Sequence, residues 1–182
     1  AIGLAPTSGV NSIPTFTTSN TTPAPIVVDI TITPFLLGCT GASETFSFTV
    51  NPTPVIDIIS DTTLCSGDTT LDYIFTGTAG TTYNWTNDNT NIGLAANGTS
   101  NILSFTTTTP NNIAETANIT VTPIIGLCPG TPQTFTITVN PTPTVTATPS
   151  FDQDLCEGDA SLSIIFSGLT GTSYQWDVTP AL

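Results

Sequence analysis

Apolar and polar side chains alternate in short segments along most of this chain. One side chain in two is apolar in residues 27–33, 45–50, 117–122, 134–139 and 144–148. A period of two is typical of β-strands that turn one face to a core and the other to water. Residues 71–75 and 162–166 form a further matching pair of strand-like segments. The pattern predicts an all-β protein.

Turn-forming residues separate these segments. Turn signals lie at residues 76–80, 97–98, 130–132 and 167–168. Short strands at this spacing favour a sandwich of antiparallel sheets. The sequence Asn-Pro-Thr-Pro occurs twice, at residues 51–54 and 140–143. Its two prolines fix φ and remove hydrogen-bond donors, which predicts a short, semi-rigid linker at both places.

The chain also repeats itself with a period of about 90 residues. Residues 128–143 restate residues 39–54. Tyr174-Gln-Trp176 likewise restates Tyr83-Asn-Trp85. Self-similarity at a fixed period predicts an array of structural repeats, which usually serves to build length.

The linkers mark the junctions between repeats, and the sequence begins and ends in mid-repeat. Residues 1–50 correspond to the C-terminal half of one repeat, residues 51–139 to a complete β-sandwich repeat, and residues 140–182 to the N-terminal half of the next. A half-repeat of about three or four strands cannot bury a two-sheet core alone. We therefore expect each half to need completion from elsewhere.

The charge balance narrows the possible functions. The 182 residues include 13 acidic side chains and no Lys, Arg or His, for a formal net charge of −13. Without His or Lys there is no imidazole base, Ser-His-Asp triad or Schiff-base amine, so we do not expect an enzyme. Without cations the chain cannot neutralise phosphates, so neither nucleic acid nor an anionic lipid surface is an expected partner. No apolar run reaches the roughly 18 residues of a membrane span, so we expect no membrane insertion of this segment.

Several segments resemble a known repeat type. They are Leu-Cys-Ser-Gly-Asp at residues 64–68, Thr-Tyr-Asn-Trp-Thr-Asn-Asp at 82–88, Ile-Gly-Leu-Ala at 92–95, Cys128, and Thr-Ile-Thr-Val-Asn-Pro-Thr-Pro at 136–143. Together they resemble the PKD-like and immunoglobulin-like tandem repeats of large Bacteroidota surface proteins. The resemblance implies tandem immunoglobulin-like (PKD-like) antiparallel β-sandwich domains. It also implies an extracellular, cell-surface stalk or adhesin that is exported by the type IX system.

Four cysteines recur at equivalent repeat positions: Cys39, Cys65, Cys128 and Cys156. They could be free core thiols, but paired spacing in a secreted-type all-β chain favours disulfides. The default pair is Cys65–Cys128 within the complete repeat, with Cys39 and Cys156 pairing to the missing halves of their own repeats. In a simple immunoglobulin-like topology Cys65 and Cys128 lie at opposite ends, too far apart for a bridge. The alternatives are a first strand that folds back, or bridges between neighbouring domains or chains.

The aromatic pairs suggest core positions. Trp85 and Trp176 follow the second predicted strand, where immunoglobulin-like sheets place a core Trp. Tyr83 and Tyr174 precede them by two residues and therefore share their face of the strand. The alternative is that an exposed Trp binds carbohydrate.

Acidic turns offer candidate oxygen ligands for Ca²⁺, which is the one cofactor we consider. The candidates are Asp88, Asp152 and Asp154. The full EF-hand spacing does not occur, and Asp/Asn turns also form without a metal.

Two kinds of glycosylation signal are present. Asn20, Asn84, Asn97 and Asn118 lie in Asn-x-Ser/Thr sequons. Thr62 and Thr69 follow Asp in a pattern that resembles Bacteroidota O-glycosylation sites, although such matches also arise by chance in a Thr-rich chain.

The leading functional hypothesis is a structural one, a segment of a long extracellular stalk, adhesin or filament. Its partners would be neighbouring repeats of the same chain or identical subunits. One alternative is a subunit that polymerises head to tail by strand exchange between the two half-repeats. Another is a glycan-binding module.

Overall fold

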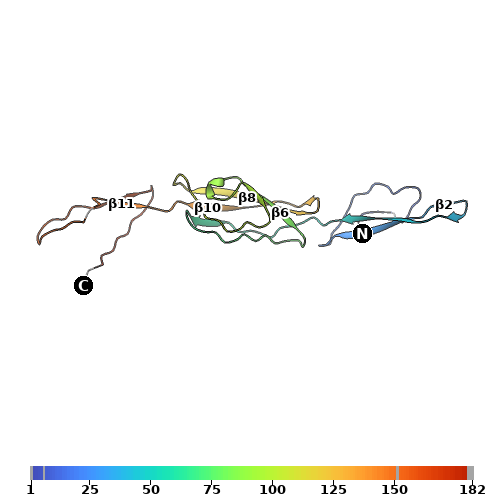
Figure 1. Ribbon diagram of the computed structural model, residues 1–182, viewed down its shortest axis with the longest axis horizontal. Coiled ribbons are helices and arrows are strands. Elements are labelled where there is room, and N and C mark those ends of the chain that lie inside the picture. The colour runs from blue at the N-terminus through green and yellow to red at the C-terminus, as the bar shows by residue number, and fades with distance from the viewer. Residues whose placement is uncertain (1, 6, 151, 180–182) are drawn as a thin grey trace.

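Strands account for nearly all the regular structure of this protein. The computed structural model describes residues 2–5, 7–150 and 152–179. Its strands lie in three groups along one long axis (Figure 1). We call these the N-terminal group (residues 2–50), the central group (residues 51–140) and the C-terminal group (residues 141–179). The all-β prediction is confirmed.

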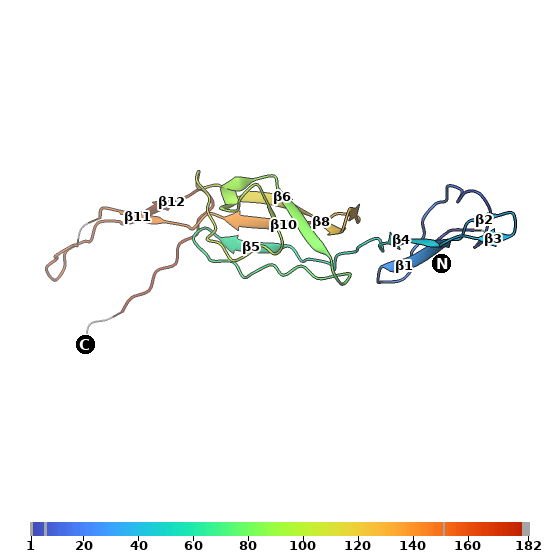
Figure 2. The ribbon, with the colours of Figure 1, turned by 45° about the vertical axis from the view of Figure 1, so that its right-hand side comes forward.

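The central group contains the largest sheet. Its strands are β5 (Thr62–Cys65), β6 (Thr82–Asn87), β7 (Asn97–Thr99), β8 (Glu115–Ile125), β9 (Cys128–Pro129) and β10 (Gln133–Asn140). They are ordered β5-β10-β8-β6-β7, with β9 also paired to β8 (Figure 2). The β5–β10 pair is parallel and the other pairs are antiparallel. Along β8 and β10 alternate side chains are buried, which fixes the register of the pair.

A second layer of extended chain covers one face of this sheet. It is joined by isolated antiparallel bridges, which pair Ile56 with Gly77, Thr69 with Thr106 and Tyr73 with Ile102. Side chains from both layers form one hydrophobic cluster that includes Phe75, Trp85, Ile102, Val121 and Phe135. The central group therefore has its own core between two β-layers.

The predicted strand at residues 71–75 is wrong in its extent, because only Tyr73 forms a bridge there. Side chains take the place of backbone partners on either side of Tyr73. The N–H of Phe75 donates to Asn101 Oδ1 at 2.9 Å, and the N–H of Ser104 donates to Asp72 Oδ1 at 2.6 Å. In each case a side-chain oxygen accepts the hydrogen bond in place of a backbone carbonyl, so the ladder is interrupted although the N–H keeps a partner.

The expected turn at Asn97-Gly98 is also wrong, because both residues belong to β7. Gly98 lies opposite Trp85 in the β6–β7 register. A Cβ on Gly98 would come within 2.4 Å of the indole atom Cζ2. Glycine is required here for the close approach of the indole ring, not for a turn.

The N-terminal group is a long hairpin with a short one at its tip. Strands β1 (Ile26–Ile32) and β4 (Glu44–Val50) are antiparallel, and β2 (Phe35–Leu36) pairs with β3 (Cys39–Thr40). Residues 2–19 pack beside the hairpin, where the N–H of Ser19 donates to the carbonyl of Ile2 at 3.0 Å. The rings of Phe16 and Phe48 meet edge to face at 5.5 Å.

The C-terminal group contains one strand pair. It joins β11 (Val145–Thr148) to β12 (Ile165–Gly168) in antiparallel register. The strand expected at residues 162–166 thus begins three residues later, and the side chains of β12 are all exposed. Residues 162–164 alternate in polarity but form no ladder, because in the described part of the chain no second sheet covers this strand pair and buries their apolar side chains.

The two Asn-Pro-Thr-Pro segments differ in burial. In residues 51–54, Pro52 and Pro54 are buried against the β8–β9 hairpin, where a Cβ on Gly130 would collide with the carbonyl of Pro54. In residues 140–143 both prolines are more exposed. The first segment has a hairpin packed on it. The second contacts the turn after β5, where Thr142 Oγ1 donates to the carbonyl of Ser66, and within the described residues no hairpin covers it.

Candidate functional site

The cysteines lie at the ends of the groups. Cys65 ends β5 and lies beside Asn140, at the C-terminal end of β10. Cys128 lies beside Ile125 in the hairpin beyond the other end of β10. The eight residues of β10 separate them by about 25 Å, whereas a disulfide needs Cα atoms within about 7 Å. The default Cys65–Cys128 pair is therefore wrong, and all four cysteines are free thiols.

The turns around Cys65 and Cys156 have the same local structure. The N–H of Cys65 donates to Asp68 Oδ2 at 2.9 Å, and the N–H of Cys156 donates to Asp159 Oδ2 at 2.9 Å. In both turns the aspartate N–H donates back to the cysteine carbonyl. Both thiols are exposed. These turns hold a thiol at one end of a group, without a partner thiol nearby.

The two Tyr-x-Trp segments have opposite environments. Tyr83 and Trp85 are buried in the central core, and Trp85 is 7% exposed. Burial raises the pKa of the Tyr83 phenol, and the negative charge of Asp57 raises it further. Trp176 is 70% exposed, so it is not packed in a core within its own half-repeat. Tyr174 is half-buried beside Phe166, with ring centroids 5.8 Å apart.

The acidic side chains do not assemble into a metal site. Among the described residues no three metal-ligating side chains cluster. Both oxygens of Asp88 are already occupied, because Asn118 donates to them from its backbone N–H and from its side-chain amide, each at 2.7 Å. The Asn118 side-chain bond, followed by the backbone bond, lowers the pKa of Asp88. Asp152 and Asp154 stay candidates, and Asp88 is better described as a clamp between β8 and the end of β6.

The candidate glycosylation residues vary in accessibility. Asn84, Asn97 and Asn118 are exposed, whereas Asn20 is half-buried. The amide of Asn20 donates to the carbonyls of Ala24 and Val50, at 2.9 and 2.7 Å. Thr62 is half-buried in β5, and Thr69 is exposed at a bridge to Thr106.

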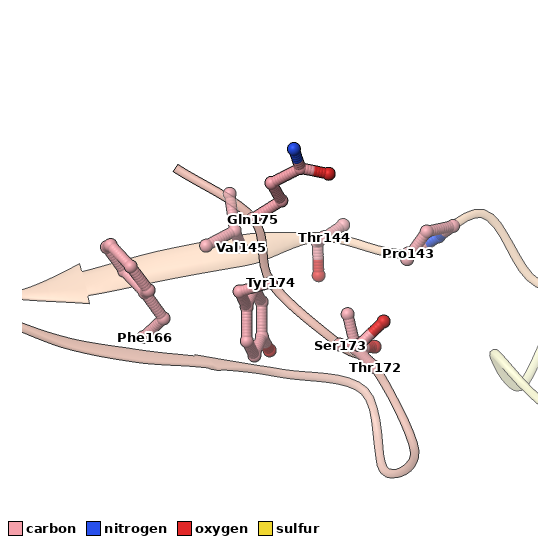
Figure 3. Close-up of a pocket in the computed structure, with 8 residues that line it drawn as sticks. All are labelled: Pro143, Thr144, Val145, Phe166, Thr172, Ser173, Tyr174 and Gln175. Atoms are coloured by element: carbon pink, nitrogen blue, oxygen red, sulfur yellow. The ribbon is translucent and has the colours of Figure 1, made fainter. Parts of the chain in front are cut away.

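The C-terminal group contains an open hollow, which the sequence pattern did not predict. Val145, Phe166 and Tyr174 line it (Figure 3). Exposed apolar side chains also line the N-terminal hairpin, including Ile32, Phe35, Leu36 and Phe46. The sequence signal for these surfaces is the self-similarity of the chain, because Val121, Ile125 and Phe135, which match Ile32, Leu36 and Phe46, are buried in the central group.

Comparison with known proteins identifies no relative. No protein family model matches the chain, and no curated protein matches it either. Within the described residues no helix has the length and hydropathy that a membrane span requires.

Proposed function

We propose that this chain is a segment of an extracellular structural array, built from tandem immunoglobulin-like (PKD-like) β-sandwich repeats. The array would form a surface stalk, adhesin or filament of the kind found on Bacteroidota. Its function is mechanical, because rigid domains set the length and proline segments limit the bending between them.

The observation that carries the proposal is a shared strand register. In the N-terminal hairpin Ile30 lies opposite Phe46, and in the central group Ile119 lies opposite Phe135. Each member of the second pair follows its counterpart by 89 positions. Two separate segments of similar sequence thus form hairpins with the same register, as expected if both belong to copies of one repeat.

The C-terminal group supports the same proposal. There Val145 lies opposite Gly168, and in the central group Ile56 lies opposite Gly77. In each case an added glycine Cβ would collide with the carbonyl before the opposing residue, at Thr144 or Val55. The same close approach of two backbones recurs in both groups, as we expect of two copies of one repeat.

Strand order supports the immunoglobulin-like type of repeat. The central sheet places β8 between β6 and β10, and β5 adds in parallel at the edge beside β10. The opposing layer contains residues 55–57, 68–78 and 102–107, joined by backbone hydrogen bonds. A buried Trp85 on β6 occupies the position of the core Trp in such sandwiches.

The other function classes receive less support. Trp85 is buried and offers no platform for a sugar ring, so the glycan-binding alternative rests on Trp176, which is 70% exposed. An enzyme would have to work with carboxylates alone, and Asp88 already uses both oxygens in hydrogen bonds. The net charge of −13 disfavours polyanionic partners.

The test of this proposal is labelling of intact cells that produce the protein. An antibody raised against the central group should label unpermeabilised cells, and proteinase K should remove the signal. Trypsin is the matched control, because it cuts after Lys and Arg, which this segment lacks. Labelling only after permeabilisation would contradict the extracellular proposal.

A further inference from the structure

The N-terminal and C-terminal groups each expose the apolar face that the central group buries. Phe135 is 2% exposed, whereas Phe46 at the same repeat position is 39% exposed. Trp85 and Trp176 differ in the same way, at 7% and 70%. Residues 2–50 match residues 92–139, and residues 141–179 match residues 52–88. The two end groups thus hold complementary halves of one sandwich.

The central group shows which side chains these faces would meet. There Trp85 lies opposite Val121 and Tyr83 lies opposite Pro123 in the β6–β8 register. The rings of Tyr73 and Phe135 are 5.3 Å apart across the two layers. At the same repeat positions Trp176 would lie opposite Ile32, Tyr174 opposite Pro34, and Ile164 over Phe46. Each pair takes one residue from each end group.

We propose that residues 141–179 of one copy pair with residues 2–50 of a second copy to form a complete β-sandwich. This inference rests on the repeat relationship in the proposed function and deepens it by naming the partner surface. The hollow lined by Val145, Phe166 and Tyr174 (Figure 3) receives the β1–β4 hairpin of the second copy. Because the two faces differ, the contact is head to tail, and the growing assembly keeps one unpaired face at each of its two ends. The assembly is therefore an open filament.

The linker at residues 140–143, which no hairpin of the described chain covers, also supports a second copy as the partner. In the first linker, Gly126 of the β8–β9 hairpin comes close to the amide of Asn51, and Ile125 is only 8% exposed. The matching hairpin of the N-terminal group has Leu36 at 73% exposed. In the filament, the β2–β3 hairpin of the second copy covers Asn140 and the prolines that follow it. The exposed apolar tip and this linker are thus covered by one contact.

Charge affects the strength of this contact. The N-terminal group has only two acidic residues, Asp29 and Glu44, whereas the C-terminal group has five. Glu44 replaces Gln133, whose amide donates to the carbonyl of Ile56 at 3.2 Å, so this hydrogen bond is not reproduced. Like charges on the two groups repel each other, and added salt should strengthen association by screening them.

The experiment measures the mass of the purified 182-residue chain in solution, under reducing conditions, as its concentration rises. We expect species at multiples of 18.8 kDa, with larger species favoured by salt. Trp176→Asp removes one face and Ile32→Asp the other, so each variant alone should be monomeric. A mixture of the two should form a dimer that does not extend, because one intact face of each kind remains. Leu71→Asp is the matched control, since Leu71 is exposed on the central group and should leave association unchanged.

Several results would overturn the proposal. They are a wild-type chain that stays monomeric, a single variant that still associates, and a mixture that stays monomeric. Loss of association in Leu71→Asp would show that contacts are non-specific. A natural polypeptide far heavier than 18.8 kDa when denatured and reduced would replace the second copy by flanking segments of the same chain. None of these results depends on surface labelling, so they are distinguishable from a failure of the proposed function.

Discussion

At the scale of single residues, the burial of a side chain depends on whether both layers of the sandwich are present around it. Trp85 packs against Gly98 beneath a complete second layer. Trp176 also follows a tyrosine by two residues, but the described residues of its own group include no strand that corresponds to β8, and it is 70% exposed. Sequence gives the residue type, whereas burial depends on which segments are assembled around it.

This difference predicts unequal effects of two matched substitutions in the dilute chain. Trp85→Ala should destabilise the central group by about 3–5 kcal/mol, because it leaves a cavity in a packed core. Trp176→Ala should change stability by less than about 0.5 kcal/mol, because the indole is mostly exposed. Differential scanning calorimetry measures both without relying on tryptophan fluorescence. Equal effects of the two substitutions would contradict the assignment of Trp85 to the core and Trp176 to an open face.

Asp88 predicts a specific dependence of stability on pH. Its two hydrogen bonds from Asn118 lower its pKa in the folded state. The unfolded chain therefore binds more protons between this folded pKa and the ordinary value of about 3.9. The stabilisation by Asp88 is fully present above the unfolded pKa and is lost as pH falls through the folded pKa. Asp88→Asn should flatten this loss.

Urea denaturation at a series of acidic pH values measures the effect. Acid also relieves the repulsion among the other carboxylates in both proteins. The difference in free energy of unfolding between wild type and Asp88→Asn at each pH removes this shared contribution. Glu157→Gln is a matched control that removes one charge from the C-terminal group. An unchanged slope in Asp88→Asn, or an equal change in Glu157→Gln, would argue against the clamp.

At the scale of elements, alternation predicted the strands that have a complete antiparallel partner. Residues 27–33, 45–50 and 134–139 lie within one residue of β1, β4 and β10. The alternation of apolar and polar residues did not predict a strand correctly where the neighbouring segment is not a regular strand. Residues 71–75 use the side chains of Asn101 and Asp72 in place of a continuous ladder. The short strand β5 pairs in parallel with β10, and that pairing leaves little pattern in four residues.

The candidate chemistry was harder to predict than the strands. Equivalent spacing correctly placed Cys65 and Cys156 in matching turns. It could not show whether Cys65 reaches Cys128, because that depends on which end of the sheet each strand approaches. The parallel direction of β5 places Cys65 beside Asn140, whereas the β8–β9 hairpin places Cys128 at the other end. Pairing of distant cysteines is a property of topology, which spacing alone does not encode.

At the scale of the whole molecule, the cysteines at the group ends become candidates for links between copies. Asn140 lies beside Cys65, and its counterpart Asn51 lies close to Gly126 in the hairpin that leads to Cys128. The matching hairpin of a second copy ends at Cys39. In the proposed filament Cys65 of one copy and Cys39 of the next therefore meet at one linker. By the same reasoning, Cys156 of the first copy meets Cys128 of the second.

This arrangement predicts which thiols glutathione disulfide can join. Two thiols give up two protons and two electrons, and each glutathione disulfide consumed leaves as two glutathione thiols. A chain with Cys128→Ser and Cys156→Ser keeps Cys39 and Cys65, and should give a ladder of covalent multimers of 18.8 kDa on a denaturing gel without reductant. A chain with Cys65→Ser and Cys156→Ser keeps only the two hairpin thiols, which never share a linker, and should stay monomeric. Equal ladders from both chains would indicate random collision of exposed thiols, and a ladder from the second chain alone would contradict the proposed contact.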